Sequence, residues 1–356
     1  MPRKSRELST LSPPAGHFAN LIVASTCYHV ILACLIARDA RFPGASLLAV
    51  NARREQMAAL CDPLAHAGDS PFAETMQLPY AGGSRPARER ANGRWLAGLD
   101  DAVRAERVII FNDLKPDIQL LCRRARARGA QTFCAEDGGA AYSSLSWASP
   151  WRLHWRRVVR FGPWIENLTA SGSSRHVQIC LALHPSLVRP ELQRKPVWAL
   201  QGSALPDLLS SSWIGRFLLH YQVSREALVC DELYALARGR TEKVREQLRR
   251  RLGEEIRVAR QAGRDCVVKY HPQEPEDFLG AAALGARLLP ADIPAELVYL
   301  ASGQRLRRVI GDAGTTLLTA RWLVPQAQVL SVLDLSGRDD PWYARTLDRL
   351  GVQPLR

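Results

Sequence analysis

The sequence predicts an α/β protein with two parallel, doubly wound sheets, arranged as two Rossmann-like domains. Three observations predict this fold. Apolar strand-like runs alternate with helical stretches over residues 20–135, the alternation returns after residue 196, and 356 residues exceed what one hydrophobic core normally organises. We expect one domain over residues 1–190, a second over 191–340 and a terminal helix over 341–356.

The first half of the chain alternates five strand-like runs with four helical stretches. Its first run begins at Asn20 and is strongly apolar, and a helix is expected from Tyr28. Parallel strands are covered by helices on both faces, so they carry apolar side chains on both faces, as these runs do. The expected strands are 20–26, 46–50, 76–79, 107–111 and 131–135, and the expected helices are 28–37, 53–66, 88–105 and 118–127.

The second half repeats this alternation. Residues 196–202 are predicted to form the first strand of the second sheet. Residues 241–262 are mostly charged but carry apolar side chains four residues apart. This pattern predicts a surface helix rather than a helix that binds nucleic acid. The remaining expected elements are a strand from Cys266, a helix over 294–301, a strand over 307–311 followed by a helix, a strand over 328–333 and a helix over 342–350.

The composition indicates which kinds of partner the protein binds and in which cellular compartment it is expected. A net charge of +13 favours anionic partners, whether nucleic acid, lipid headgroups, acidic glycans or nucleotide phosphates, and does not choose among them. No apolar run reaches the roughly 20 residues that span a bilayer, and the first six residues do not lead into a signal-peptide segment. We therefore expect a cytoplasmic protein, either free or attached peripherally to the inner face of the membrane.

The cysteines indicate neither a disulfide framework nor a zinc site. They are scattered, without a Cys-x-x-Cys pair, and several lie in apolar runs. We expect reduced, buried thiols and no metal. The eight are Cys27, Cys34, Cys61, Cys122, Cys134, Cys180, Cys230 and Cys266.

The segment from Cys266 to Pro272 carries the first candidate functional group. An apolar strand ends in Lys269, Tyr270, His271 and Pro272, and ligands of doubly wound sheets lie at the carboxyl ends of the strands. His271 could therefore face a ligand. The alternative is a histidine that caps a neighbouring loop, and His184-Pro185 shows that the dipeptide recurs elsewhere.

Two adjacent carboxylates end an expected strand of the first half. Glu136 and Asp137 follow the strand over 131–135, and Gly138-Gly139 permits a tight turn. A carboxylate in this position can act as a general base. The alternative is an acidic turn or a helix cap.

A third candidate lies at the start of a helix in the second half. Gly311, Asp312, Ala313 and Gly314 form a turn after a strand, and Thr315-Thr316 then begin a helix. Hydroxyls and unpaired backbone amides at a helix start can bind an anion without a lysine. The segment lacks the Gly-Lys-Ser/Thr of a P-loop, and a simple capping turn is the alternative.

Residues 147–164 are rich in tryptophan and arginine. Trp147, Trp151 and Trp155 recur every four residues among arginines and valines. This pattern suits a helix at a membrane interface, with its rings at headgroup depth. It also suits a helix that packs between domains and has a solvated basic face, and the sequence does not decide between the two.

The three motifs together resemble the bacterial sialyltransferases and polysialyltransferases of the two-Rossmann (GT-B) type. Those families carry an Asp/Glu-Asp/Glu-Gly motif, a His-Pro motif and a Ser/Thr pair, which correspond here to Glu136–Gly138, His271-Pro272 and Thr315-Thr316. The opening Ser25-Thr26 and the segment around Glu296 also resemble these enzymes. The resemblance implies two domains that face each other across a cleft.

The resemblance also implies an activity and a set of residue roles. The protein would transfer sialic acid or a related nonulosonate from a CMP-activated donor to a cell-surface glycan, with inversion and without metal or cofactor. Asp137 would be the base, and His271 would stabilise the departing cytidylate. The nucleotide would be held by Lys269, Pro272, Glu296, Gly314, Thr315 and Thr316, and the donor and acceptor pocket would include Ser25, Thr26, Glu136 and Gly138.

Several alternatives share parts of this pattern. A Kdo or other nonulosonate transferase and a CDP-glycerol phosphotransferase would keep the nucleotide half and change the donor pocket. A non-catalytic basic binding protein would use the same residues only for packing. The expected partners are a CMP-sugar, a glycan acceptor that is free or lipid-linked, and an anionic membrane surface, with no nucleic acid.

Overall fold

The computed structural model describes residues 17–51, 55–78, 84–236, 241–272, 274, 276–312, 314–336 and 340–355. Two compact units make up this structure. The first comprises the described residues up to Ala65 together with Ser70–Ala135 and Trp147–Cys180. The second comprises His66–Asp69, Glu136–Ser146 and the chain from Leu181 onwards.

The first sheet has seven strands in the order β3-β2-β1-β4-β5-β6-β7. The pairs among β1 to β5 are parallel, and every residue of β1 and β2 is buried, as expected for strands covered on both faces. The strands are β1 (Asn20–Ala24), β2 (Ser46–Val50), β3 (Glu74–Gln77), β4 (Arg107–Ile110), β5 (Gln131–Ala135), β6 (Ile179–Ala182) and β7 (Val197–Ala199).

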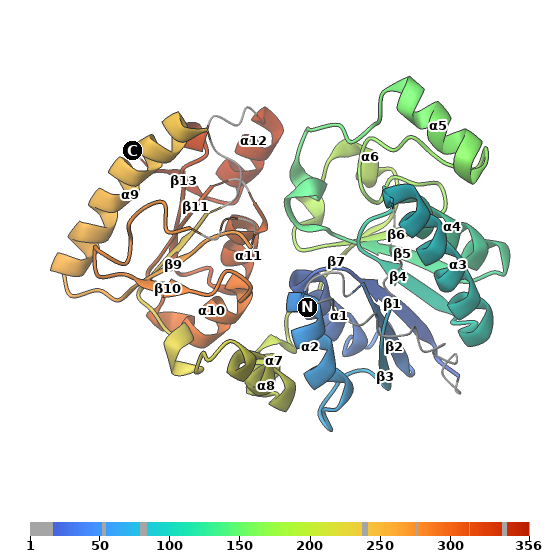
Figure 1. Ribbon diagram of the computed structural model, residues 1–356, viewed down its shortest axis with the longest axis horizontal. Helices are drawn as coiled ribbons and strands as arrows, with labels where there is room; N and C mark the ends of the chain where they lie inside the picture. The colour runs from blue at the N-terminus through green and yellow to red at the C-terminus, as the bar shows by residue number, and fades with distance from the viewer. Residues whose placement is uncertain are drawn as a thin grey trace, which may run out of the picture. The chain divides into compact units, whose positions relative to one another are not determined.

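Right-handed crossovers place the helices of this half on opposite faces of the sheet. The chain moves outward from β1 through β2 to β3 and then returns to the other side of β1, so two helices cover each face. Figure 1 shows α3 and α4 side by side, away from α1 and α2. The helices are α1 (Cys27–Ala37), α2 (Glu55–Ala65), α3 (Arg85–Val103), α4 (Pro116–Ala127), α5 (Trp151–Phe161) and α6 (Pro190–Gln193), with short 3-10 turns at Gly138–Tyr142 and Pro185–Leu187.

The second sheet has six strands in the order β10-β9-β8-β11-β12-β13, and all its pairs are parallel. Its strands are β8 (Glu232–Ala235), β9 (Cys266–Lys269), β10 (Arg287–Leu289), β11 (Arg308–Gly311), β12 (Gln328–Ser331) and β13 (Gln353–Pro354). Its helices are α7 (Leu205–Ser210), α8 (Ser212–His220), α9 (Glu242–Gln261), α10 (Ala295–Ser302), α11 (Thr315–Leu323) and α12 (Pro341–Arg349), with 3-10 turns at Glu226–Leu228, Gly303–Arg305 and Asp334–Ser336.

These sheets confirm the predicted fold class of two parallel, doubly wound sheets, and all eight cysteines are buried free thiols, as expected. One strand prediction is wrong. Val197–Ala199 is the edge strand of the first sheet, not the first strand of the second. The second sheet instead begins at Glu232, so the chain passes from one sheet to the other after β7.

Helix α9 covers one face of the second sheet through the apolar stripe that the sequence predicts. Leu248, Leu252 and Ile256 are fully buried and belong to one core cluster with Val268 of β9 and Ile310 of β11. In Figure 1, α9 lies on one side of this sheet, and α10, α11 and α12 lie on the other. The sheet is therefore held between two layers of helices.

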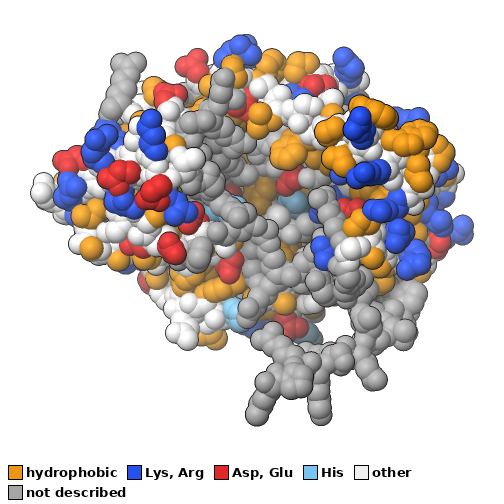
Figure 2. Space-filling view, turned by 45° about the horizontal axis from the view of Figure 1, so that its top comes forward, with side chains coloured by type: hydrophobic (Ala, Val, Ile, Leu, Met, Phe, Trp, Pro, Cys, Tyr) orange, Lys and Arg blue, Asp and Glu red, His pale blue; other side chains and the backbone are white. Residues whose placement is uncertain are grey.

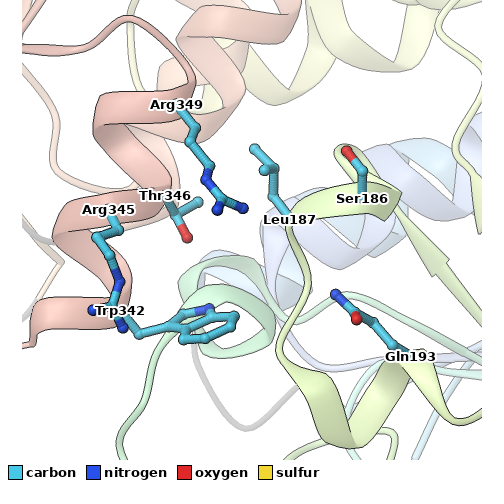
Figure 3. A pocket seen from close by; sticks show the side chains of 7 residues that line it. All are labelled: Ser186, Leu187, Gln193, Trp342, Arg345, Thr346 and Arg349. Carbon is cyan, nitrogen blue, oxygen red and sulfur yellow. The ribbon is translucent and has the colours of Figure 1, made fainter.

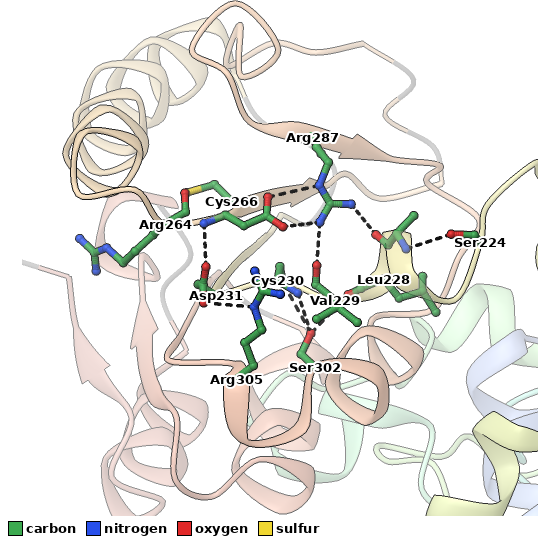
Figure 4. A network of polar contacts seen from close by, with 12 residues as sticks. Ser224, Leu228, Val229, Cys230, Asp231, Arg264, Cys266, Arg287, Ser302 and Arg305 are labelled. Carbon is green, nitrogen blue, oxygen red and sulfur yellow. Dashed lines mark hydrogen bonds and ion pairs between the residues drawn. The ribbon is translucent and has the colours of Figure 1, made fainter.

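A polar network fixes the amino edge of the second sheet (Figure 4). The guanidinium of Arg287 donates to the carbonyl oxygens of Ala227 at 2.6 Å and Val229 at 2.7 Å, and it pairs with Asp265 at 2.7 Å. Asp231 accepts from the backbone amide of Asp265 at 2.8 Å. This edge is opposite to the carboxyl ends of the strands, so we infer a structural role for the network.

The Arg287→Gln variant tests this role. We expect it to lower the free energy of unfolding by about 2 kcal/mol, because two carbonyls and a carboxylate lose charged hydrogen bonds on a half-exposed side chain. The matched control is Arg257→Gln on α9, which removes only an exposed pair with Glu254 and should cost less than about 1 kcal/mol. Denaturant unfolding measures both, and equal losses would contradict the structural role.

Candidate functional site

Three strand ends lie next to one another at the carboxyl edge of the second sheet. The register pairs Lys269 of β9 with Ala235 of β8, and Ala235 with Gly311 of β11. Neighbouring strands are about 4.8 Å apart, so Lys269 and Gly311 end within roughly 10 Å of each other. The chain order reverses between β8 and β11, and ligands of doubly wound folds bind at this point.

The turn after β11 brings the start of α11 close to the sheet. A Cβ atom at Gly311 would lie 3.0 Å from the carbonyl oxygen of Ala235 and 3.1 Å from Leu317 Cδ2, so a larger side chain would push the helix away. Thr315 and Thr316 form the first turn of α11, and both are half-buried. No side chain caps this helix start and no acidic residue lies in its first turn, so its amides and hydroxyls suit an anion.

Gly138 lies directly against Thr315. Gly138 has a φ of +64°, and a Cβ atom there would lie only 1.8 Å from Thr315 Oγ1. Gly139 also approaches this turn, with a Cβ position 3.8 Å from the carbonyl carbon of Gly314. Both segments belong to the same compact unit, so the acid-glycine motif and the hydroxyl pair meet although 177 residues separate them in the chain.

The two acids of the first motif have different environments. Glu136 is 4% exposed, and its carboxylate accepts hydrogen bonds from the hydroxyl of Tyr142 and, at 2.8 Å, from the backbone amide of Leu183. Burial, together with this carboxylate, raises the pKa of Tyr142 well above its usual range. Asp137 is half-buried and begins the 3-10 turn. Glu136 therefore holds the turn in place, and Asp137 is the acid that solvent reaches.

Helix α12 connects the same two segments. Asp340 caps this helix through the backbone amide of Tyr343 and also accepts hydrogen bonds from the hydroxyls of Ser143 at 2.5 Å and Ser144 at 2.7 Å. Burial alone would raise the pKa of Asp340, but these bonds outweigh it and lower the pKa. The hydroxyl of Tyr343 donates to the carbonyl oxygen of Gly314 at 2.6 Å. The start of α12 thus ties residues 143–144 to the turn before α11.

Glu296 is linked to α11 from the side of α10. Glu296 is 6% exposed, and its carboxylate accepts a hydrogen bond from Thr319 Oγ1 at 3.1 Å. Burial raises the pKa of Glu296, although its hydrogen bonds and the nearby charge of Lys269 oppose the shift. Lys269 Nζ donates to the carbonyl oxygens of Tyr270 at 3.2 Å and Ala291 at 2.9 Å, so the ammonium group also holds the segment after β10.

His271 and Pro272 lie just after β9, with Tyr270 between the strand and the dipeptide, and both are half-buried. The carbonyl oxygen of His271 accepts from the backbone amide of Glu274 at 2.8 Å, which turns the chain after the dipeptide. This position is at the carboxyl edge that also carries Thr315. The catalytic role of His271 stays a prediction.

Ser25 and Thr26 lie in the other compact unit, at the carboxyl end of β1. Thr26 Oγ1 caps α1 by accepting from the backbone amide of His29 at 3.1 Å, and the backbone amide of Ser25 donates to His29 Nδ1 at 3.2 Å. The ring of His29 stacks on Phe111 at 4.4 Å. β1 and β4 are the strands between which the chain order of the first sheet reverses, so this end also suits a ligand.

Four residues that position the candidate site carry no recognisable signal of this role in the sequence. Tyr142, Tyr343 and Asp340 make the contacts described above, and none belongs to a motif. His184 donates its backbone amide to the hydroxyl of Tyr142 at 3.1 Å, and its ring Nε2 lies 3.3 Å from the carbonyl oxygen of Leu318 in α11. Burial lowers the pKa of His184. The only sequence signal was that His184-Pro185 follows β6 as His271-Pro272 follows β9.

A cavity of about 320 Å³ lies beside α12 (Figure 3). The guanidinium carbon of Arg345 lies 5.5 Å from the centre of the Trp342 ring, and Arg349 points toward the segment opposite. The charged side chains of the lining are both cationic, which favours an anionic group. The lining residues are Ser186, Leu187, Gln193, Trp342, Arg345, Thr346 and Arg349.

No protein-family model matches the chain, and no curated protein is detectably similar to it in sequence. Solved structures match it in fold. UDP-GlcNAc 2-epimerase from Neisseria meningitidis, bound to UDP-GlcNAc, has a TM-score of 0.56 at 12% identity and covers 94% of this chain and 86% of its own. UDP-GlcNAc 2-epimerase from Methanocaldococcus jannaschii has a TM-score of 0.56 at 10% identity, with coverages of 94% and 88%. At these identities the likeness shows the fold alone, a GT-B-like fold with two Rossmann-type sheets.

The Gly138→Ala variant tests the close approach of the two motifs. We expect it to lower the free energy of unfolding by about 3 kcal/mol, because it combines a strained positive φ with a clash against Thr315. The matched control is Gly129→Ala, at a φ of +90° with nothing within 4 Å of the added carbon, which should cost about 1 kcal/mol.

A double-mutant cycle separates the clash from the strain. Thr315→Ala removes the hydroxyl that the added carbon would meet, so Gly138→Ala should cost about 1 kcal/mol less in that background. Denaturant unfolding of the four proteins gives the coupling. Additive losses, or equal costs at Gly138 and Gly129, would show that the turn does not lie on Thr315.

Proposed function

We propose that the protein is a metal-independent, inverting glycosyltransferase that moves sialic acid, or a related nonulosonate, from a CMP-activated donor to a cell-surface glycan. The fold is one that nucleotide-sugar enzymes use. The contact between Gly138 and Thr315 carries the proposal, because it joins the motif with the candidate base to the motif with the candidate phosphate site. The motifs themselves support sialyl transfer through their resemblance to sialyltransferases.

On the nucleotide side, the start of α11 would bind the cytidylate phosphate. Thr315 and Thr316 supply hydroxyls, and the first-turn amides supply further donors without a competing side-chain cap. His271 would donate a proton or a charged hydrogen bond to the phosphate as it leaves. Glu296 lies in the first turn of α10 and would accept hydrogen bonds from the ribose hydroxyls. No step in this scheme needs a metal.

On the acceptor side, Asp137 would take the proton of the attacking hydroxyl. The acceptor oxygen forms a bond to the anomeric carbon of the donor, the bond from that carbon to the cytidylate oxygen breaks, and CMP leaves with the bonding electrons. Attack opposite to the leaving group inverts the anomeric centre. Glu136 fixes the backbone of this turn through Tyr142 and Leu183, so Asp137 keeps its position during the reaction.

One specific observation supports a second function. The solved structures with this fold include epimerases that bind UDP-GlcNAc, so a nucleotide-sugar epimerase is the nearest alternative in fold. A Kdo or CDP-glycerol transferase would keep the cytidylate site and change the donor pocket. A non-catalytic basic binding protein would turn over none of these compounds.

Turnover of activated sugars tests the proposal. Purified protein is incubated with CMP-N-acetylneuraminate, CMP-Kdo, CDP-glycerol or UDP-GlcNAc, together with galactose-terminated and sialylated oligosaccharides. The proposal predicts acceptor-dependent release of CMP from the first donor, without added metal and in the presence of a chelator. Turnover of UDP-GlcNAc alone would support the epimerase, and turnover of CMP-Kdo or CDP-glycerol alone would reassign the donor.

The Asp137→Asn variant tests the base. We expect turnover to fall about 100-fold or more with CMP binding unchanged, because the amide cannot accept the proton but keeps the shape of the side chain. The control is Asp207→Asn, an exposed aspartate in α7 that should leave both quantities unchanged. Turnover near that of the parent protein would remove Asp137 as the base.

The His271→Ala variant tests the leaving-group role. We expect a much larger loss in turnover than in CMP affinity, because the phosphate gains charge mainly in the transition state. His220→Ala, an exposed histidine at the end of α8, is the control. Calorimetry gives the affinities and CMP release gives the rates. Equal losses would mean that His271 only binds the nucleotide.

A further inference from the structure

Helix α5 projects a basic and aromatic surface that no other part of its own unit covers. None of its eleven residues is buried. Five of the nine large hydrophobic side chains that are exposed among the described residues lie between Trp147 and Val159. Figure 2 shows orange and blue side chains gathered over this helix. We call these residues, 147–160, the α5 surface.

The α5 surface has two adjacent stripes. Trp151, Trp155 and Val159 are four residues apart, so they share one side of the helix, and they are 71%, 60% and 72% exposed. Arg152, Arg156 and Arg160 follow the same spacing one position later and form a neighbouring stripe. Apolar rings and guanidinium groups therefore point outward together.

The charge on this surface is of one sign. Arg157 adds a fourth guanidinium to the helix, and the sequence has no aspartate or glutamate from Gly138 to Ile165. Among the described residues, no carboxylate pairs with the four arginines of α5. Their charges are thus available to an external anionic surface.

The helix is attached at both ends, although none of its own side chains is buried. The backbone amide of Trp147 donates to the carbonyl oxygen of Thr169 at 2.9 Å, and Ser149 exchanges hydrogen bonds of 2.7 and 2.8 Å with the side chain of Asn167. After the helix, Ile165 is 4% exposed and anchors the returning chain. The exposed side chains therefore lie on a positioned element.

We propose that the α5 surface docks on an anionic lipid bilayer, with α5 lying in the plane of the headgroups. Indole rings favour the headgroup region, and arginines next to them bind lipid phosphates. Eleven residues make a helix only about 16 Å long, too short to cross a bilayer. No helix among the residues that the structure describes has the length and apolar content to do so either.

Other occupants fit these side chains less well. A second copy of the chain would bring four further arginines against the first four, which repel them. A nucleic acid would pair with the guanidiniums but leave Val159 and Leu153 without apolar contact. A bilayer supplies both the phosphates and the apolar layer beneath them.

Sedimentation with vesicles tests the proposal without a donor or an acceptor, so its outcome is independent of the proposed transferase activity. We expect the parent protein to sediment with phosphatidylglycerol vesicles at low salt, to bind phosphatidylcholine vesicles much less, and to dissociate as salt screens the charges. Replacing Arg152, Arg156 and Arg160 together by glutamine should lower the partition coefficient roughly a hundredfold. Trp151→Ala combined with Trp155→Ala should also lower it.

A charge-matched control separates the α5 surface from the net charge of the protein. Lys243→Gln, Arg250→Gln and Arg257→Gln together remove three exposed cations from α9 and should change binding by about twofold or less. Circular dichroism checks that each variant is folded. The proposal is overturned if the parent protein stays in the supernatant with phosphatidylglycerol vesicles, if the two triple variants lose binding equally, or if duplex DNA displaces the vesicles.

Discussion

The absence of a side chain at Gly138 allows the two candidate motifs, the acid pair after β5 and the hydroxyl pair of α11, to meet. Gly138 adopts a left-handed backbone conformation and lies so close to Thr315 that a Cβ atom would overlap the threonine hydroxyl. The acid that follows β5 and the hydroxyls that open α11 depend on this approach for their relative position. The Asp340 cap and the Tyr343 hydroxyl support the same contact from α12.

The two acids of the motif next to this contact differ in environment. Glu136 is buried and receives hydrogen bonds from Tyr142 and Leu183, so it fixes the turn. Asp137 keeps solvent access because Glu136 takes the buried position. Around the candidate phosphate site the pattern is similar, since Thr319 holds Glu296 against α11 through a hydrogen bond and Thr315 and Thr316 lie half-buried at the helix start. In both places a buried, hydrogen-bonded acid holds the local structure, and the half-buried residues near it are the candidate reactive or binding groups.

Much of the fold follows from local pattern, and the exceptions have physical causes. The long apolar runs of β1, β2 and β4 predict buried parallel strands, and the stripe of α9 predicts its buried face. The short strand Val197–Ala199 was assigned to the wrong sheet, because an edge strand of three residues carries no signal of its partner. Strand β8 begins with the buried acid Glu232, which pairs with Arg264. Because a charged residue interrupts the apolar pattern, the sequence did not predict this strand.

The site was predictable only where a motif marks it. Glu136–Gly138, His271-Pro272 and Thr315-Thr316 stand out through residue type at strand and helix ends. Tyr142, His184, Asp340 and Tyr343 do not, because their roles come from contacts between segments that lie far apart in the chain. Residues 147–164 were expected to form either a membrane-interface helix or a helix that packs between domains, and the structure has a helix at Trp151–Phe161, which both interpretations require.

Nucleotide selectivity is the most direct test, because we propose that the carboxyl edge of the second sheet binds a cytidylate. Calorimetric titration of the purified protein with CMP, UMP and UDP measures this without knowledge of the acceptor. We expect CMP to bind at least about tenfold more tightly than UMP, a difference of about 1.4 kcal/mol, and more tightly than UDP. Preferential binding of UDP, or no binding of CMP at all, would contradict it.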